Sequence, residues 1–151
     1  MTFDFNILPP STIQVRVEEA PSPDVSHQVV EKLCKTVLRG EGDNLLLDFS
    51  GQRSSNLTSE LTRNYLVSVD AFLSKSWARR GGKFPIAILA LGGTFGYGIG
   101  RMILGHAYGL KVLELDQFED RQAALDWLNN TFRAAATHLS VDVTSDAMRG
   151  T

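Results

Sequence analysis

Several features that define whole classes of proteins are missing from this sequence. There is one cysteine, Cys34, so a disulfide framework within the chain is excluded. No apolar run approaches the roughly 20 residues that a membrane-spanning helix needs. The first ten residues, MTFDFNILPP, lack the basic start and the apolar stretch of a secretory signal peptide. We therefore expect a protein of the reducing cytoplasm, with Cys34 as a small buried hydrophobic residue.

A strong excess of charge of one sign is also absent. The 151 residues carry a formal net charge of −2 and a pI near 5.9, which gives no electrostatic basis for binding nucleic acid or an anionic membrane. Apolar residues make up 43% of the chain and charged residues 21%, a balance typical of a folded globular domain. A chain of this length can bury a core of its own, and we predict a single domain over residues 1–136.

Hydrophobic periodicity predicts alternating strands and helices. Two half-buried strands at 2–7 and 12–18 flank Pro9-Pro10, which is typical of a hairpin. Short apolar runs predict further strands at 45–47, 86–91 and 112–115. Apolar stripes at three- and four-residue spacing predict helices at 23–38, 58–79, about 97–107 and about 120–136.

The predicted fold is an α/β domain of order ββαβαβαβα. Its sheet is mixed but mostly parallel, with a leading hairpin, right-handed crossovers and helices packed on the sheet. The polar residues 52–56 predict a loop. Residues 137–151 have no periodicity and predict a loosely ordered C-terminal tail.

Three stretches carry a family resemblance. They are YGIGRM at 97–102, the helix FEDRQAALDWL at 118–128, and LLLDFSG at 45–51, which is similar to the LLxDxSG strand end of STAS domains. Together they resemble small bacterial STAS/SEC14-like domains of the anti-sigma-factor-antagonist superfamily. The resemblance covers most of residues 2–130 and implies the same α/β fold. It also implies action by binding a protein, by a phosphorylatable serine, or by holding lipids and other apolar ligands.

The resemblance directs attention to the start of the helix predicted at 58–79. In phosphoswitch relatives an Asp-Ser-Ser-Gly-like turn opens this helix, whereas this chain has Asn56-Leu57-Thr58-Ser59 and lacks the acid and the glycine. If the chain carries such a switch, Thr58 or Ser59 is the expected phosphosite, because an added phosphate is stabilised at a helix N-terminus.

A glycine-dense segment separates the strand at 86–91 from the next helix. Such a turn can bring backbone N–H groups close to a phosphate. The i, i+2, i+5 spacing of a dinucleotide site is not met from Gly96 or Gly98, and no Gly-Lys-Ser/Thr of a P-loop occurs. We expect close packing of helix on sheet, which would compensate the helix-weakening Gly98, Gly100 and Gly105. A ligand-facing turn is the alternative.

The predicted parallel sheet brings polar and aromatic residues to one edge. Ligands of such sheets bind beyond the carboxyl ends of the strands. Arg101 is expected either to contact an anion or Asp116 there, or to be a solvent-exposed side chain or part of a weak ion pair at the rim. Phe95 and Tyr97 are expected either to gate an apolar pocket or to plug the sheet end. The candidate rim residues are Asp48, Ser50, Thr94, Phe95, Tyr97, Arg101 and Asp116.

The sequence contains no recognisable motif for catalysis or metal binding. His27, His106 and His138 have no metal-ligand spacing, and there is no G-x-S-x-G, H-E-x-x-H or C-x-x-C sequence. We therefore expect no metal, no cofactor and no catalytic residue, and we expect these histidines at the surface.

The sequence favours a non-catalytic binding or regulatory domain that engages a protein partner or a small apolar, lipid-like ligand at the rim. A pocketless homo-oligomeric signalling adaptor is the alternative. An enzyme would require Asp48, Arg101 and Asp116 to converge on a nucleophile. An apolar cavity of roughly 300 Å³ or more would indicate ligand binding, whereas a closed rim would indicate an adaptor.

Overall fold

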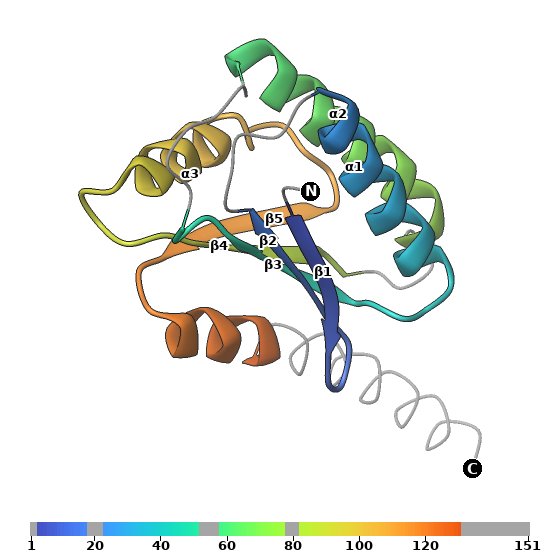
Figure 1. Ribbon diagram of the computed structural model, residues 1–151. Coiled ribbons are helices and arrows are strands. Elements are labelled where there is room, and N and C mark those ends of the chain that lie inside the picture. Colours follow the sequence, from blue (N-terminus) through green and yellow to red (C-terminus); the bar gives the residue numbers. More distant parts are fainter. Residues whose placement is uncertain (1–2, 18–22, 52–57, 78–81, 131–151) are drawn as a thin grey trace.

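The computed structural model describes residues 3–17, 23–51, 58–77 and 82–130 (Figure 1). The loop predicted at 52–56, the last turns of the final predicted helix and the predicted tail at 137–151 lie outside these ranges. Within the described ranges, the elements follow the predicted order ββαβαβαβα.

Five strands form one sheet in the order β1-β2-β3-β4-β5. They are β1 (Phe3–Leu8), β2 (Thr12–Val17), β3 (Asn44–Asp48), β4 (Phe84–Leu89) and β5 (Leu113–Phe118). β1 and β2 pair antiparallel, with Ile7 opposite Ile13, and every later pair is parallel. The predicted mixed sheet with a leading hairpin is confirmed.

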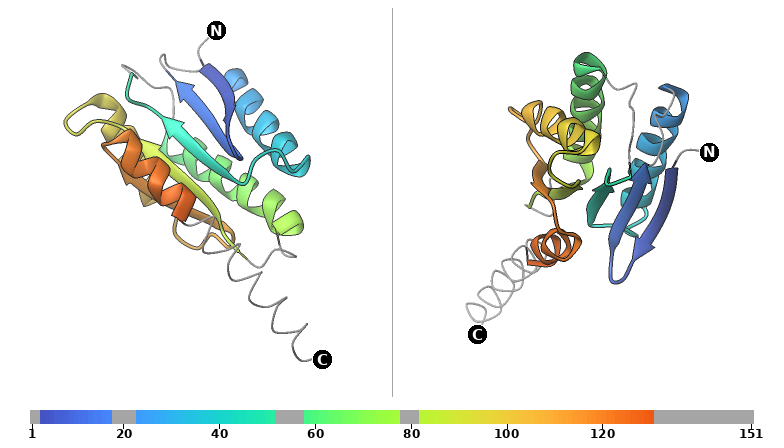
Figure 2. Two further views of the ribbon diagram at one scale, coloured as in Figure 1. Left: turned by 90° about the horizontal axis from the view of Figure 1, so that it is seen from below. Right: turned by 60° about the vertical axis from the view of Figure 1, so that its left-hand side comes forward.

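The helices form a layer on each side of the sheet. α1 (Pro23–Leu38), α2 (Ser59–Trp77) and α3 (Phe95–Gly105) lie on one face, and the helix that occupies 121–130 lies on the other (Figures 1 and 2). β4 is covered from both sides, and all six of its residues are buried. A strand covered on both faces needs apolar side chains at every position, which explains its continuous apolar sequence.

Two strands, β4 and β5, end two or more residues away from the predicted position. β4 stops at Leu89, and Leu91 is 54% exposed. β5 continues past Leu115 to Phe118, because its parallel pairing with β4 extends to the Leu89–Phe118 pair. Pairing with β4 supplies backbone hydrogen bonds to the polar residues of β5, so the strand extends beyond its apolar residues.

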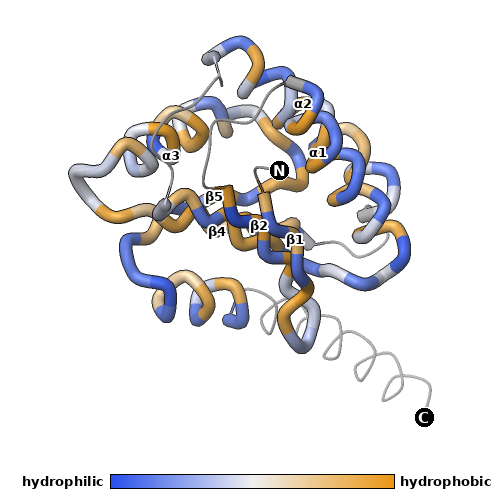
Figure 3. Tube along the Cα trace, in the orientation of Figure 1, coloured by the Kyte–Doolittle hydropathy of each residue, from blue (hydrophilic) through white to orange (hydrophobic). Residues whose placement is uncertain are grey.

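The sheet divides the apolar core into two layers. Neighbouring residues of a strand point to opposite faces, so Leu45 packs in the layer under α1 and α2, whereas Leu46 packs with Ala124 and Leu128 of the final helix. Figure 3 shows hydrophobic and hydrophilic residues alternating along α1 and α2. Cys34 is buried as predicted, and this burial raises the pKa of its thiol.

Candidate functional site

The carboxyl ends of the central strands and the start of α3 adjoin, as the sequence predicted. Gly96 lies so close to the residue after β3 that a Cβ atom at this position would be 2.1 Å from Phe49 O. On the other side, Gln117 Nε2 donates to Tyr97 O at 3.0 Å, which joins the end of β5 to the same helical turn. The end of β3, the first turn of α3 and the end of β5 therefore contact one another at the rim.

Asp48 and Ser50 form a closed turn at the end of β3. Asp48 is 5% exposed, and its Oδ1 accepts hydrogen bonds from Ser50 N at 2.9 Å and from Ser50 Oγ at 2.5 Å. A carboxylate that bonds the chain two residues on is typical of an Asx turn. These two side chains thus shape the strand end in addition to lining the rim.

A hollow of about 520 Å³, lined mostly by polar and charged residues, opens beside this turn, on the face that carries the final helix. Its lining residues are Gln14, Arg16, Asp48, Ser50, Leu89, Leu91, Glu119 and Arg121. Arg121 Nη2 donates to Gln14 Oε1 across it. The sequence prediction missed the basic residues here. Period-two alternation in β2 was the available signal, because Arg16 pairs with Asp48 in the parallel register and shares its face.

The residues that open α3 have different environments. Thr94 is the N-cap of α3, where its Oγ1 accepts from Tyr97 N at 3.3 Å and donates to Leu91 O at 2.5 Å. Tyr97 packs against the core layer, as expected of a side chain that plugs the sheet end. Phe95 is 46% exposed and Leu91 is 54% exposed. Two large apolar side chains at the start of α3 are therefore about half exposed to solvent.

The glycines of α3 divide between two faces. A Cβ atom at Gly100 would lie 2.7 Å from Gln117 Nε2 and 2.9 Å from Ile88 Cγ2, so Gly100, like Gly96, permits the helix to approach the sheet. At Gly98 and Gly105 an added Cβ would meet nothing within 4 Å. The prediction that close packing compensates Gly98 and Gly105 is wrong, because both lie on the outward side of the helix.

Arg101 and Asp116 do not form the contact that was one alternative of the prediction. Arg101 is exposed, and Asp116 Oδ1 accepts from the adjacent Gln117 N at 2.8 Å. Among the described residues, neither a hydrogen bond nor an ion pair links Arg101 to Asp116 or Asp48. Arg101 is the solvent-exposed side chain that the second alternative predicted.

The N-terminus of α2 is tied to the C-terminus of α3 by four residues, Ser59, Arg63, His106 and Tyr108, which we call the α2–α3 clasp. Ser59 Oγ hydrogen-bonds to His106 Nε2 at 2.5 Å. Arg63 Nη1 donates to His106 O at 2.6 Å and to Tyr108 O at 2.7 Å, and its guanidinium carbon lies 4.4 Å from the centre of the Tyr108 ring. Pattern reasoning missed this cluster because its two halves, one on α2 and one after α3, are more than forty residues apart in the sequence.

Thr58 has a different role at the N-terminus of α2. Its Oγ1 accepts from Leu61 N at 3.1 Å, the bond that an N-cap side chain makes to the third helical residue. Of the two predicted phosphosites, Thr58 therefore serves as a cap and Ser59 as a link to α3.

The fold of this chain, rather than its sequence, resembles that of known proteins. No family model and no curated protein matches this sequence. The structure matches a solved structure of the anti-sigma factor antagonist SpoIIAA in its unphosphorylated form, with a TM-score of 0.54 and 11% sequence identity, covering 85% of this chain and 96% of that chain. The chain has the SpoIIAA fold. The STAS-like fold that the sequence motifs predicted is thereby confirmed.

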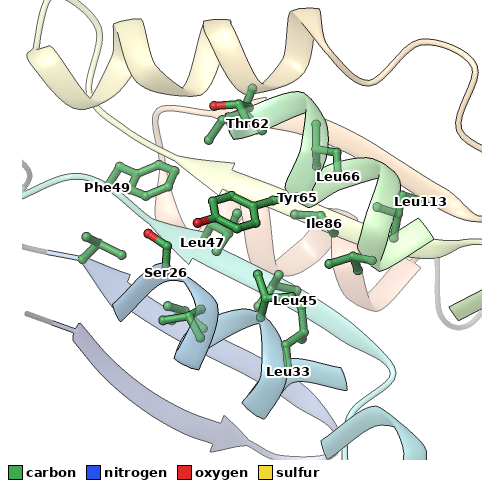
Figure 4. A pocket seen from close by; sticks show the side chains of 16 residues that line it. Ser26, Leu33, Leu45, Leu47, Phe49, Thr62, Tyr65, Leu66, Ile86 and Leu113 are labelled. Carbon is green, nitrogen blue, oxygen red and sulfur yellow. The ribbon is translucent and has the colours of Figure 1, made fainter. Parts of the chain in front are cut away.

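Within the SpoIIAA-like fold, an apolar cavity lies between the sheet and the helices α1 and α2 (Figure 4), and Phe49 at the end of β3 and Ile103 of α3 also line it. Its volume is about 140 Å³, which is below the roughly 300 Å³ of a drug-sized ligand site. No described helix has the length and apolar character to cross a membrane. No group of three His, Cys, Asp or Glu residues in the described ranges is placed to hold a metal ion.

Proposed function

We propose that the chain is a non-catalytic regulatory domain that binds a protein partner through the outward side of α3 and the turn before it. We call this the α3 surface and define it by Leu91, Phe95, Gly98, Arg101 and Gly105. The observation that carries the proposal is the exposure of Leu91 and Phe95 beside a helix face on which Gly98 and Gly105 leave open space.

The chemistry of the α3 surface suits a protein partner. Two glycines without internal packing weaken the helix by up to about 1 kcal/mol each, and close approach of a partner's backbone is a contact that only glycine permits. Phe95 supplies the exposed aromatic anchor that interface hot spots favour. Arg101 adds planar donors at the edge of the surface.

Two further observations favour a protein over a lipid-sized ligand. The solved structure with the same fold is that of an anti-sigma factor antagonist, a description that implies an effect on another protein. The apolar cavity of about 140 Å³ is too small for a drug-sized molecule.

Phe95→Ser is expected to weaken partner binding by at least about tenfold, because truncating a central aromatic anchor commonly removes more than 1.4 kcal/mol. The partner is first identified by placing a photo-crosslinking residue at Phe95 in the source organism. Affinity for that protein is then measured with purified Phe95→Ser and Arg101→Ala chains. Because both residues are exposed, the melting temperature should stay within a few degrees of the original.

Gln122→Ala is the matched control, since Gln122 is exposed on the opposite face of the sheet. Equal partner affinities of Phe95→Ser and Gln122→Ala would show that the α3 surface does not bind the partner. Crosslinking of Phe95 to a second copy of the same chain, with a dimer in sedimentation, would support the homo-oligomeric adaptor instead.

Phosphorylation of Ser59 is the regulatory step that we assign to this domain. Ser59 combines an exposed hydroxyl, a helix N-terminus, a histidine and a nearby arginine in the α2–α3 clasp. A phosphate there would gain charge-assisted hydrogen bonds from these groups and from the helix end. Since the clasp joins α2 to α3, the modification would act on the element that presents the α3 surface.

Ser59→Ala is expected to lower the free energy of unfolding by about 1 kcal/mol through loss of the bond to His106. Ser59→Asp should restore most of that loss, because a carboxylate is favourable in the first turn of a helix. Urea denaturation of both variants, with Ser68→Ala in the middle of α2 as the control, measures the difference. Greater destabilisation by Ser59→Asp than by Ser59→Ala would show that the clasp rejects negative charge and would contradict the phosphosite.

A further inference from the structure

We propose that two copies of this chain associate through β1 and join their sheets into one continuous sheet, with a twofold axis at Phe5. The surface consists of the residues of β1, Phe3–Leu8. It lies apart from the α3 surface, because β1 forms one edge of the sheet whereas α3 contacts β4 and β5 toward the other edge (Figure 2). The inference goes beyond the proposed function, and both α3 surfaces stay free in such a dimer.

The outer side of β1 carries backbone groups that pairing with β2 does not use. β1 is the first strand in the sheet order and, among the described strands, is hydrogen-bonded to β2 alone. In an antiparallel pair, every second residue turns its N–H and C=O groups away from the neighbouring strand. This edge therefore presents a row of donors and acceptors that water or another strand has to satisfy.

The sequence of β1 lacks the features that usually protect an edge strand from pairing. FDFNIL contains neither proline nor lysine, and its one charged residue is Asp4. Ile7 is 44% exposed, so an apolar side chain is already accessible at the edge. Six residues are also a typical length for a paired strand. These properties favour the addition of a further strand at β1.

The strand is complementary to itself in one register. Antiparallel pairing about an axis at Phe5 places the two Phe5 residues opposite each other and Phe3 opposite Ile7 of the second copy. It also places Asp4 opposite Asn6 of the second copy, so that a carboxylate meets an amide donor. Apolar side chains then meet on one face of the joined sheet and polar side chains on the other, as alternation along the strand requires.

The two neighbouring registers fit less well. An axis at Asp4 would place two carboxylates directly opposite each other, which is destabilising. An axis at Asn6 would place Asp4 opposite the apolar Leu8 of the second copy. Because a shift by one residue would turn every side chain to the wrong face, the register at Phe5 is the one that the side chains of β1 select.

The same register continues the rows of side chains that cross each sheet. In the pairings of β2, Arg16 lies between Asp48 of β3 and Asp4 of β1. Asn6 of the second copy would extend this row, so no two like charges become neighbours. On the opposite face, Phe5 packs against the apolar core layer of its own domain. The two Phe5 rings would therefore connect the two cores.

Lys32 of α1 limits the strength of this association. Its Nζ lies 4.6 Å from the centre of the Phe5 ring, so two Lys32 ammonium groups would approach each other across the axis. Their repulsion weakens as salt screens it. A pair of short strands also buries a small interface. We expect a weak, reversible dimer that tightens with ionic strength, and Lys32→Gln should tighten it about threefold at low salt.

Sedimentation velocity of the full chain from micromolar to millimolar concentration tests the dimer. The original chain should show a monomer–dimer equilibrium. Ile7→Lys should weaken it by at least about tenfold, because the new charge faces Phe3 of the second copy. Val67→Lys is the matched control, since Val67 lies on α2 and is 43% exposed, close to the 44% of Ile7. Thermal denaturation confirms that each variant is folded.

Two variants of Asn6 test the register. Asn6→Lys should tighten the dimer about fivefold, because the symmetry places a lysine opposite Asp4 twice. Asn6→Asp should weaken it by a similar factor, since each new carboxylate faces the carboxylate of Asp4. Asn6 is exposed, so neither change should alter the fold. A dimer formed elsewhere on the molecule would respond equally to both variants.

Engineered cysteines locate the contact directly. A mixture of Asp4→Cys and Asn6→Cys chains should form a disulfide between the two copies under mild oxidation, because directly opposite residues lie about 5 Å apart. Asp4→Cys alone should link poorly, since its two cysteines would be diagonal neighbours about 7–8 Å apart. Mass spectrometry of the linked peptides separates these disulfides from any that involve Cys34.

Several results would overturn the proposal. A purely monomeric chain at millimolar concentration and high salt would do so, as would equal dimerisation of folded Ile7→Lys and Val67→Lys. Linking of Asp4→Cys alone as efficiently as in the mixture would refute the register. A dimer that Phe95→Ser abolishes and Ile7→Lys leaves intact would place the contact on the α3 surface instead.

Discussion

Gly96→Ala is expected to lower the free energy of unfolding by about 2 to 3 kcal/mol. The new Cβ atom would lie 2.1 Å from Phe49 O and 3.2 Å from Phe49 Cβ, well inside van der Waals contact. The Phe49 backbone is itself held in place, because Phe49 N donates to Leu89 O at 2.9 Å. The first turn of α3 would therefore have to lift from the sheet, and urea denaturation followed by circular dichroism measures the loss.

Gly98→Ala makes the same chemical change two residues away and is expected to have the opposite sign. An added Cβ at Gly98 meets nothing within 4 Å, so the variant gains helix propensity of about 0.5 to 1 kcal/mol without a clash. It also adds a methyl group to the α3 surface, and we expect weaker partner binding despite the higher stability. Similar destabilisation of both variants would show that contact with Phe49 is not the cause.

Asp70→Ala is expected to lower the free energy of unfolding by about 3 to 5 kcal/mol, because buried N–H groups would lose a charged acceptor. Asp70 lies on α2 and is 7% exposed. Its Oδ1 accepts from the backbone nitrogens of Lys111 at 3.0 Å, Val112 at 2.8 Å and Leu113 at 3.1 Å. One carboxylate thus fixes α2 to the segment that starts β5.

Chemical denaturation of Asp70→Ala measures this effect, and Asp126→Ala is its control. Asp126 is an exposed carboxylate on the final helix that accepts a bond from Gln122 Nε2, so its removal should change stability by no more than about 0.5 kcal/mol. Asp70→Asn should lie between the two, because it keeps one acceptor oxygen but loses the charge. A cost for Asp70→Ala no larger than that for Asp126→Ala would refute the anchoring role.

The Asp70 anchor also predicts a dependence of stability on pH. Burial raises the pKa of Asp70, but the backbone N–H donors of residues 111–113 and the charge of Lys83 together outweigh it, so the net pKa is lowered. The unfolded chain therefore binds the proton more readily. The stabilisation is present above the unfolded value of about 3.9 and is lost as the pH falls through the lower folded value. Below about pH 4, the original chain should lose stability more steeply than Asp70→Asn.

Much of the fold was predictable because it depends on local patterns of apolar and polar residues. Alternation in β1 and β2, the apolar run of β4 and the stripes of α1 and α2 each depend on residues within one element. The motifs at 45–51, 97–102 and 118–128 added the STAS-like resemblance, which the structural match confirms as a fold. Strand ends were less accurate, since pairing with a neighbouring strand decided where β4 and β5 stop.

The sequence by itself determined the class of fold, the order of its elements and the edge of the sheet where α3 begins. Only the tertiary structure decided which glycines of α3 are essential, since Gly96 faces the Phe49 backbone and Gly98 faces open space. It also decided the partners of Asp70 and Ser59 and the position of the cavity lined by Thr62 and Tyr65. The physical reason is distance along the chain. Helical and strand periods arise between near neighbours, whereas these contacts join segments that only packing brings together.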